Sequence, residues 1–180
     1  MLVFPDTNVL YRIRLADLLL RACAMHLFTL AWSDELLSEL SRVLSKKKKL
    51  PREAVEGFIE AIKSISPLGR IDPSHYQHLV ARMLGPDASD HFLSAAIRGG
   101  QIDILITDNL SDFPASDVGD QCNVCTPDEF FSTLIRKYPT EMNLIIREII
   151  EQLIRPRLTL EELRQQYANS GLLEFARLIA

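Results

Sequence analysis

The stretch that decides the fold is Met1-Leu2-Val3-Phe4-Pro5-Asp6-Thr7-Asn8-Val9-Leu10. A short apolar run ends on Asp6, and apolar residues at helical spacing follow at once. This order predicts a buried β-strand with an acid at its carboxyl end, leading directly into a helix. In open α/β sheets, ligands bind beyond the carboxyl ends of the strands, so Asp6 is expected at a functional edge.

The rest of the first 137 residues continues this alternation of strands and helices. We expect strands at 26–31, 68–71, 102–107 and around 124, and helices at 8–24, 33–44, 51–65, 74–84 and 88–98. Such an order predicts a parallel sheet covered by helices on both faces. A further helix is expected to begin at Thr126-Pro127, with threonine as its cap and proline in its first turn.

The C-terminal part has a different pattern. Residues 141–180 carry helical periodicity, Pro156 interrupts it, and Thr159-Leu160-Glu161-Glu162 is a capping box that restarts a helix. We therefore expect one α/β domain over residues 1–137 and a helical extension over residues 138–180 packed on it.

Composition narrows the class of protein. The chain has 180 residues, of which 47% are hydrophobic and 24% are charged, which is ordinary for a globular protein. Cys122 and Cys125 form a CxxC pair without further zinc ligands, so we interpret them as strand positions and expect a reducing, cytoplasmic setting. No apolar run approaches the roughly 20 residues of a membrane span. The net charge of −4 means that a nucleic-acid partner would need cations to offset the acids.

Acidic side chains recur where strands end or helices begin. Glu39 flanks the apolar stripe of the 33–44 helix. The others stand on the functional rim of the expected sheet: Asp6, Asp87, Asp90, Asp108 and Asp112, with Asn109 among them. Clustered carboxylates repel one another, so a fold that gathers them needs a cation. Hard oxygen ligands suit Mg²⁺ or Mn²⁺, and such an ion can support hydrolysis of a phosphodiester bond.

Each acid also has a purely structural interpretation. Asp6 can be a turn former or a helix cap, and Asp87 and Asp90 can be N-terminal caps. Glu39 can be a solvated flank of its helix, and the acids near residue 110 can be loop residues. The run Lys46-Lys47-Lys48-Lys49 is typical of a solvated helix end, with contact to an RNA backbone as the alternative.

Four segments together resemble the PIN-domain ribonucleases. They are, in chain order, Phe4-Pro5-Asp6-Thr7-Asn8-Val9-Leu10, Leu36-Leu37-Ser38-Glu39-Leu40, Pro86-Asp87-Ala88-Ser89-Asp90-His91 and Ile106-Thr107-Asp108-Asn109-Leu110-Ser111-Asp112-Phe113-Pro114. Thr126-Pro127-Asp128-Glu129-Phe130 resembles the closing stretch of the same family. The resemblance covers about residues 1–137 and rests on the order and spacing of the motifs.

The resemblance implies a three-layer α/β/α fold with a central parallel sheet of four or five strands. It implies an endoribonuclease that uses Mg²⁺ or Mn²⁺, and many bacterial members are toxins of VapC type that a small antitoxin protein silences. The family often forms dimers. Asp6, Glu39 and Asp90 match its three core acids.

The fourth acidic position of the family falls on Asn109, which brings no charge. Asp112, or else Asp108, is a candidate to compensate, so the expected catalytic set is Asp6, Glu39, Asp90 and Asp112. The expected metal ligands are Asp6, Asp90, Asn109 and Asp112. The candidates for accessory or orienting roles are Thr7, Asn8, Asp87, Thr107 and Asp108.

Two alternatives remain open at this point. Asn109 favours a non-catalytic PIN-like module that binds RNA or protein after losing a second metal. The other alternative is a phosphatase of the haloacid-dehalogenase type, which needs Asp-x-Asp-x-[Thr/Val] after the first strand. The residue two places after Asp6 is Asn8, which speaks against that class.

Overall fold

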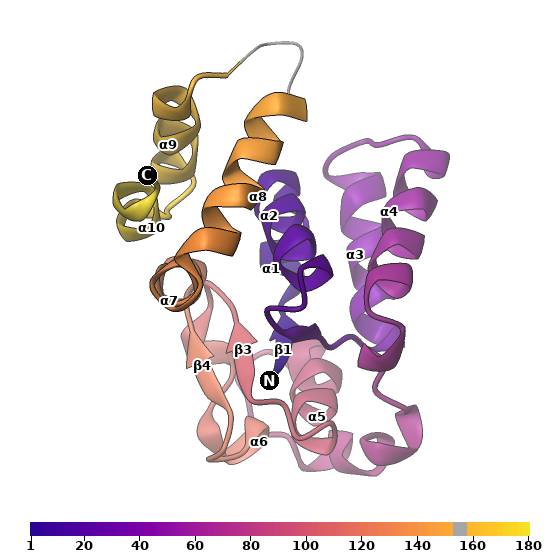
Figure 1. The fold of residues 1–180 in the computed structure, drawn as a ribbon. Helices are drawn as coiled ribbons and strands as arrows, with labels where there is room; N and C mark the ends of the chain where they lie inside the picture. The colour runs from indigo at the N-terminus through magenta and orange to yellow at the C-terminus, as the bar shows by residue number, and fades with distance from the viewer. Residues whose placement is uncertain (153–157) are drawn as a thin grey trace. The chain divides into compact units, whose positions relative to one another are not determined.

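The computed structural model describes residues 1–152 and 158–180. They form two compact units, Met1–Cys125 and Thr126–Ala180. The first unit contains a four-stranded sheet with covering helices, and the second is built from helices (Figure 1). Pro156, where we expected an interruption of the C-terminal helices, lies outside the described residues.

The sheet of the first unit is parallel, and its strand order is β2-β1-β3-β4. The strands are β1 (Leu2–Pro5), β2 (Thr29–Leu30), β3 (Ile104–Ile106) and β4 (Asn123–Cys125). In the register, Phe4 pairs with Leu105, and Leu105 pairs with Val124. The chain leaves β1 toward β2 and later returns to β3 on the other flank of β1. The gap between β1 and β3 is therefore the topological switch point, where open α/β sheets bind ligands.

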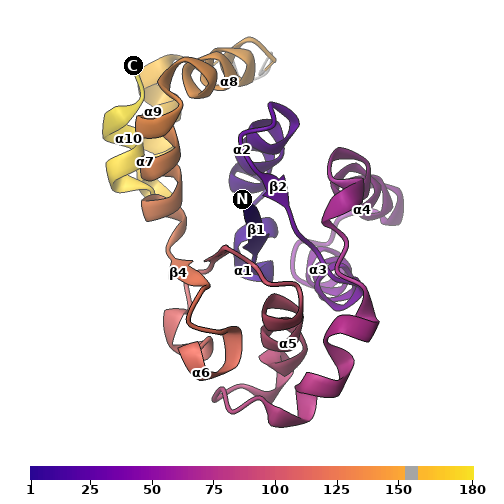
Figure 2. The same cartoon turned by 60° about the horizontal axis from the view of Figure 1, so that its bottom comes forward.

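Helices cover this sheet on both faces, which confirms the expected three layers. They are α1 (Thr7–Leu10), α2 (Ile13–Ala24), α3 (Asp34–Lys46), α4 (Arg52–Ile65), α5 (His91–Gly99) and α6 (Ala115–Val118). In both Figure 1 and Figure 2, α2 lies on one side of the strands, and α5 and α6 lie on the other. Val3, Phe4, Leu105 and Ile106 are fully buried, as expected for strands covered on both faces.

The expected helix over residues 8–24 is in fact two helices, because the chain leaves helical conformation at Arg12. The backbone of Arg12 is extended, with φ −84° and ψ 91°. Its Nε donates to the carbonyl oxygen of Asn8 over 3.1 Å, and Nη2 pairs with Asp108 over 2.5 Å. That ion pair joins residues 96 positions apart, so local periodicity could not reveal it.

Two expectations between α4 and α5 are also corrected. The expected strand over residues 68–71 is reduced to an isolated parallel bridge between Arg70 and Trp32, since a 3₁₀ turn occupies Pro67–Gly69. A Cβ at Gly69 would lie 1.8 Å from the carbonyl oxygen of Leu30, so the turn packs directly on the backbone of β2. The expected α-helix at 74–84 is replaced by 3₁₀ turns at Pro73–His75 and Gln77–Arg82.

The second unit is helical over its described residues, as the sequence predicted. Its helices are α7 (Pro127–Lys137), α8 (Pro139–Gln152), α9 (Leu160–Asn169) and α10 (Leu173–Leu178). Capping boxes begin α7 at Thr126 and α9 at Thr159. Phe175 of α10 packs against both α7 and α9, because the centroid of its ring lies 5.5 Å from that of Phe131 and 5.4 Å from that of Tyr167.

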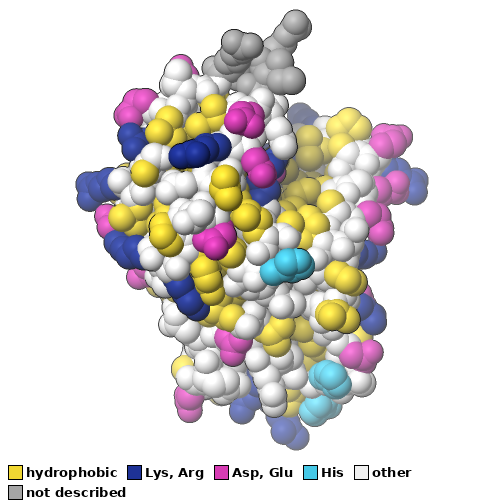
Figure 3. Space-filling view, viewed as in Figure 1, with side chains coloured by type: hydrophobic (Ala, Val, Ile, Leu, Met, Phe, Trp, Pro, Cys, Tyr) yellow, Lys and Arg dark blue, Asp and Glu magenta, His cyan; other side chains and the backbone are white. Residues whose placement is uncertain are grey.

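Charged side chains on the face seen in Figure 3 are interspersed with hydrophobic ones, in keeping with the nearly balanced charge. None of the described helices combines the length and the apolar character that crossing a membrane requires. All three cysteines are free thiols, and Cys125 is the last residue of β4.

Candidate active site

Asp6 stands at the switch point of the sheet, directly after β1. Its backbone nitrogen donates to the carbonyl oxygen of Ile106 over 2.9 Å, which binds it to the end of β3. The residue is 6% exposed. It occupies the N-cap position of α1, yet its side chain makes no capping hydrogen bond. A capping hydrogen bond therefore does not hold its carboxylate, although the backbone N–H groups of Thr7 and Asn8 lower its pKa.

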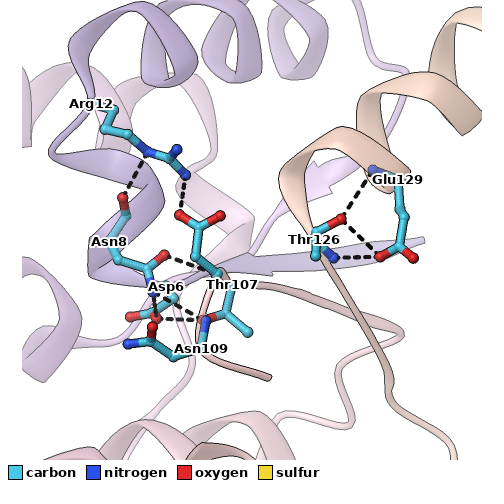
Figure 4. A network of polar contacts seen from close by, with 8 residues as sticks. Asp6, Asn8, Arg12, Thr107, Asn109, Thr126 and Glu129 are labelled. Atoms are coloured by element: carbon cyan, nitrogen blue, oxygen red, sulfur yellow. Dashed lines mark hydrogen bonds and ion pairs between the residues drawn. The ribbon is translucent and has the colours of Figure 1, made fainter. Parts of the chain in front are cut away.

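The carboxylate of Asp6 is oriented by two side chains instead (Figure 4). Thr107, fully buried at the end of β3, donates from Oγ1 to Oδ2 of Asp6 over 2.7 Å. Asn8 donates from Nδ2 to the same oxygen over 2.5 Å and to Oγ1 of Thr107 over 3.1 Å. The backbone nitrogen of Asn109 completes the network by donating to Oγ1 of Thr107 over 3.0 Å.

The pKa of Asp6 is raised above its usual value, chiefly because burial disfavours the charged form. The hydrogen bond from Thr107 opposes this rise, and the negative charge of Glu39 adds to it. Asp6 is thus held in one orientation in a place where burial disfavours its charged form.

Glu39 reaches the same region from α3. Its Oε2 accepts a hydrogen bond of 2.9 Å from Oγ1 of Thr7, the residue that follows Asp6. Arg42, one turn further along α3, lies 3.8 Å from the other carboxylate oxygen. Thr7 is buried and Glu39 is half-buried, so Glu39 is turned toward the end of β1 rather than being a solvated flank of its helix.

Asp90 ends a 3₁₀ turn over Ala88–Asp90 and precedes α5, with no capping hydrogen bond from its side chain. Its pKa is raised to about 7. Burial is the largest cause, followed by the negative charges of neighbouring acids, which are Asp6, Asp87, Glu39 and Asp112. The structure thus brings acids from four separate sequence motifs within electrostatic range of one another.

Asp87 has a structural role that the sequence allowed for. It is the N-cap of the 3₁₀ turn, and its Oδ1 accepts hydrogen bonds from the backbone nitrogen of Ser89 over 2.9 Å and from its hydroxyl over 2.7 Å. These bonds lower the pKa of Asp87. Asp87 is exposed and adds negative charge beside Asp90.

The three candidate residues in the segment after β3, Asp108, Asn109 and Asp112, have different surroundings. Asp108 is exposed and pairs with Arg12 over 2.5 Å, so its charge is compensated there. Asn109 lies beside Asp6 and Thr107 (Figure 4). Asp112, half-buried at the end of a 3₁₀ turn, raises the pKa of Asp90 and is therefore near the other acids.

Sequence reasoning missed Asp117, a buried acid in α6 that is 1% exposed. Its Oδ2 accepts hydrogen bonds of 2.7 Å from the backbone nitrogens of both Leu84 and Gly85. The carbonyl oxygen of Gly85 in turn lies 2.9 Å from Nε2 of His91. Asp117 thereby fixes the loop that leads to Asp90. The sequence shows only that Asp117 lies between the apolar residues Phe113 and Val118, and its partners at Leu84 and Gly85 are more than 30 residues away.

The donor chemistry of the site suits a hard divalent cation, since carboxylate oxygens predominate and the acids raise the pKa of Asp90. Over residues 1–152 and 158–180, no group of three or more His, Cys, Asp or Glu side chains is arranged to hold a metal ion. Mg²⁺ commonly binds through one or two carboxylates and keeps several waters, so it does not require three converging side chains.

Comparison with known proteins gives the family. The sequence model of the PIN domain matches residues 3–111, from β1 to the 3₁₀ turn that contains Asp112. The chain therefore belongs to the PIN-domain family, whose members are generally nucleases. Searches of curated proteins and of solved structures returned no match.

Proposed function

We propose that this protein is an endoribonuclease that hydrolyses RNA phosphodiester bonds with Mg²⁺ or Mn²⁺, and that the unit Met1–Cys125 carries the reaction. The arrangement that supports this most is the group of acids at the carboxyl end of β1, where Thr107 orients Asp6, Thr7 binds Glu39, and the neighbouring acids add to the rise in the pKa of Asp90. Arg12 pairs with Asp108, and Arg42 lies 3.8 Å from Glu39, but burial and neighbouring acids still disfavour the charged form of Asp90, which a divalent cation would stabilise.

In this proposal Asp6 and Asp90 hold the ion, and Glu39 and Asp112 complete the acidic set. Thr107 and Asn8 fix the carboxylate of Asp6, and Thr7 fixes that of Glu39, so these three residues are positioning residues. A divalent cation held by these carboxylates would supply positive charge next to the scissile phosphate and would lower the pKa of a bound water. Hydrolysis by in-line attack leaves a 3′-hydroxyl and a 5′-phosphate.

Cleavage of purified RNA in the presence of Mn²⁺ tests the proposal, with Asp6→Asn compared against Asp120→Asn. Asp120 is an exposed acid before β4, at the opposite edge of the sheet. We expect Asp6→Asn to abolish cleavage and Asp120→Asn to cleave as the wild type does. Unchanged cleavage by Asp6→Asn would remove Asp6 from the mechanism.

One observation favours a second function. Asn109 stands where the family resemblance places a fourth acid, so the site has one negative charge fewer than the family pattern. A non-catalytic module that binds RNA or protein would fit that loss. Titration calorimetry with Mn²⁺ separates the two functions, because a module of this kind would bind the ion weakly and cleave no RNA.

We also propose that the protein is the toxin of a toxin–antitoxin pair, on the strength of the resemblance to VapC-type members. A short neighbouring reading frame that encodes a small DNA-binding protein would support this role. The direct test is co-expression. Growth arrest by the chain alone, relieved by the neighbouring product and absent with Asp6→Asn, is the expected result, and a chain without any effect on growth would contradict it.

A further inference from the structure

Four of the six lysines of the chain are consecutive, from Lys46 to Lys49. All four are exposed. Lys46 ends α3, where a cation suits the helix dipole. The dipole accounts for one lysine in the last turn and leaves the three that follow without a role in the helix. In a protein with a net charge of −4, such a run is a local positive surface on an otherwise acidic molecule.

One contact links this positive surface to the residues that follow α1. Nζ of Lys48 lies 5.4 Å from the centroid of the Tyr11 ring. Tyr11 follows α1, and its backbone nitrogen donates to the carbonyl oxygen of Thr7 over 3.0 Å. Thr7 is the residue that binds Glu39. The ring of Tyr11 therefore lies between Lys48 and α1, the helix whose first residue, Thr7, binds Glu39.

Helix α3 gives a second, independent link between the two charges. Glu39 and Lys46 are seven residues apart on this helix, which places them on one face and about 10 Å apart along the axis. Arg42, between them in sequence, reaches back to Glu39. The same helix thus presents an acid toward the end of β1 and a series of cations leading away from it.

We propose that Lys46–Lys49 and Tyr11 form a binding track for the backbone of single-stranded RNA, which guides phosphates toward Asp6 and Glu39. The inference rests on the proposed ribonuclease function and adds the direction from which the strand is bound. Lysines neutralise phosphates without regard to sequence, and a half-buried tyrosine ring offers a face on which an unpaired base can stack. The acids elsewhere repel a polyanion, so the strand is drawn to this track.

Binding of a fluorescent single-stranded RNA, measured by anisotropy in EDTA so that no hydrolysis interferes, tests the track. The test variant replaces Lys46, Lys47, Lys48 and Lys49 with glutamine. A charge-matched control replaces four cations elsewhere with glutamine, namely Lys63, Arg82, Lys137 and Arg147. Circular dichroism verifies that both variants are folded.

Salt dependence is the decisive readout. Each lost phosphate contact should reduce the slope of log K against log salt by about 0.7, so the loss of two or three contacts predicts a decrease of about 1.5–2. We expect the test variant to bind at least about 10-fold more weakly at moderate salt, and the control to keep the wild-type slope. Equal slopes for the two variants, or no binding by the wild type, would overturn the track.

Tyr11 is tested separately from the lysines. Tyr11→Ala should weaken binding by about 10-fold without changing the salt slope, since a stacked base carries no counterions, and Tyr11→Phe should bind as the wild type does. A change of slope with Tyr11→Ala, or loss of binding with Tyr11→Phe, would contradict stacking on this ring.

The outcomes also separate this inference from the proposed function. If the track binds RNA with the expected slope but Mn²⁺ supports no cleavage, the ribonuclease proposal fails and the track stands. If the protein cleaves RNA and the lysine variant keeps the wild-type KM and kcat on a long strand, the ribonuclease stands and the track fails. The track predicts a KM raised by about 10-fold with kcat retained, because it binds substrate away from the reacting bond.

Discussion

Thr107 donates from Oγ1 to Oδ2 of Asp6 over 2.7 Å, and this bond joins the carboxyl ends of β3 and β1. The two residues are 101 positions apart in the chain. They face each other because β1 and β3 are parallel neighbours, and Pro5 and Ile106, the residues just before them, are paired. The hydroxyl of Thr107 therefore sets the orientation of the carboxylate on which the proposed site depends.

Replacement of Thr107 by valine tests this relationship. Valine keeps the volume of the buried side chain and removes the hydroxyl, so Asp6 loses one donor. We expect Mn²⁺ affinity and RNA cleavage to fall by about 10–100-fold, as is typical when a hydrogen-bond partner of a metal ligand is lost. Thr107→Ser keeps the hydroxyl and should restore most of both. If Thr107→Val binds Mn²⁺ as tightly as the wild type, the hydroxyl does not position Asp6 for the ion.

The raised pKa of Asp90 makes stability depend on pH in a defined direction. The pKa is about 7 in the folded protein and near 4 in an unfolded chain, so the folded state binds more protons between these values. The free energy of unfolding of the metal-free protein should therefore decrease as the pH rises from about 4 through about 7, and the penalty should be complete above that range.

Asp90→Asn removes this penalty. At pH 8 in EDTA we expect the variant to be more stable by about 1–2 kcal/mol once solvent screening of the half-buried group is allowed for. For a chain of this length, that gain corresponds to a Tm higher by about 2–8 °C in differential scanning calorimetry. Near pH 4 the advantage should vanish. An equal difference at both pH values would mean that ionisation of Asp90 is not its cause.

Asn109→Asp supplies the charge that the fourth acidic position lacks. If Asn109 faces the ion, the substitution should increase Mn²⁺ affinity several-fold, because an added carboxylate attracts the ion more strongly than an amide does. Asn109→Ala should decrease the affinity, since it removes a carbonyl ligand. The measurement is titration calorimetry. Indifference to both changes would place residue 109 outside the coordination of the metal.

Asp117 should matter for stability before it matters for chemistry. Asp117→Ala leaves the backbone nitrogens of Leu84 and Gly85 without their acceptor, which should cost about 2–4 kcal/mol in urea denaturation. Asp117→Asn keeps one acceptor oxygen and should cost less. Equal stability of the alanine variant and the wild type would show that the loop before Asp90 is held in another way.

Much of this architecture was predictable from local pattern. The strand before Asp6 and the parallel sheet followed from apolar runs between helices, and the caps at Thr126 and Thr159 followed from local sequence motifs. The family motifs supplied Glu39 and Asp90, which taken alone were better explained as a solvated flank and a cap.

What the sequence could not supply are contacts between distant residues. The break of the first helix at Arg12 depends on Asp108, and the buried position of Asp117 depends on Leu84 and Gly85. The interpretation of Asp87 as a cap was correct, and that of Glu39 as a solvated flank was not, because only the fold brings Thr7 to Glu39. Hydrophobic periodicity carries no information on such pairs.

The proposed ribonuclease function requires that the acids around Asp6 bind a divalent cation. Titration calorimetry with Mn²⁺ at pH 8 tests this directly on the wild type, Asp6→Asn, Asp90→Asn and the control Asp120→Asn. We predict saturable binding by the wild type and by the control, and a loss of at least about 10-fold in affinity for each of the two site variants. Equal affinity in all four proteins, or no binding by the wild type, would contradict the proposal that the acids around Asp6 bind the ion.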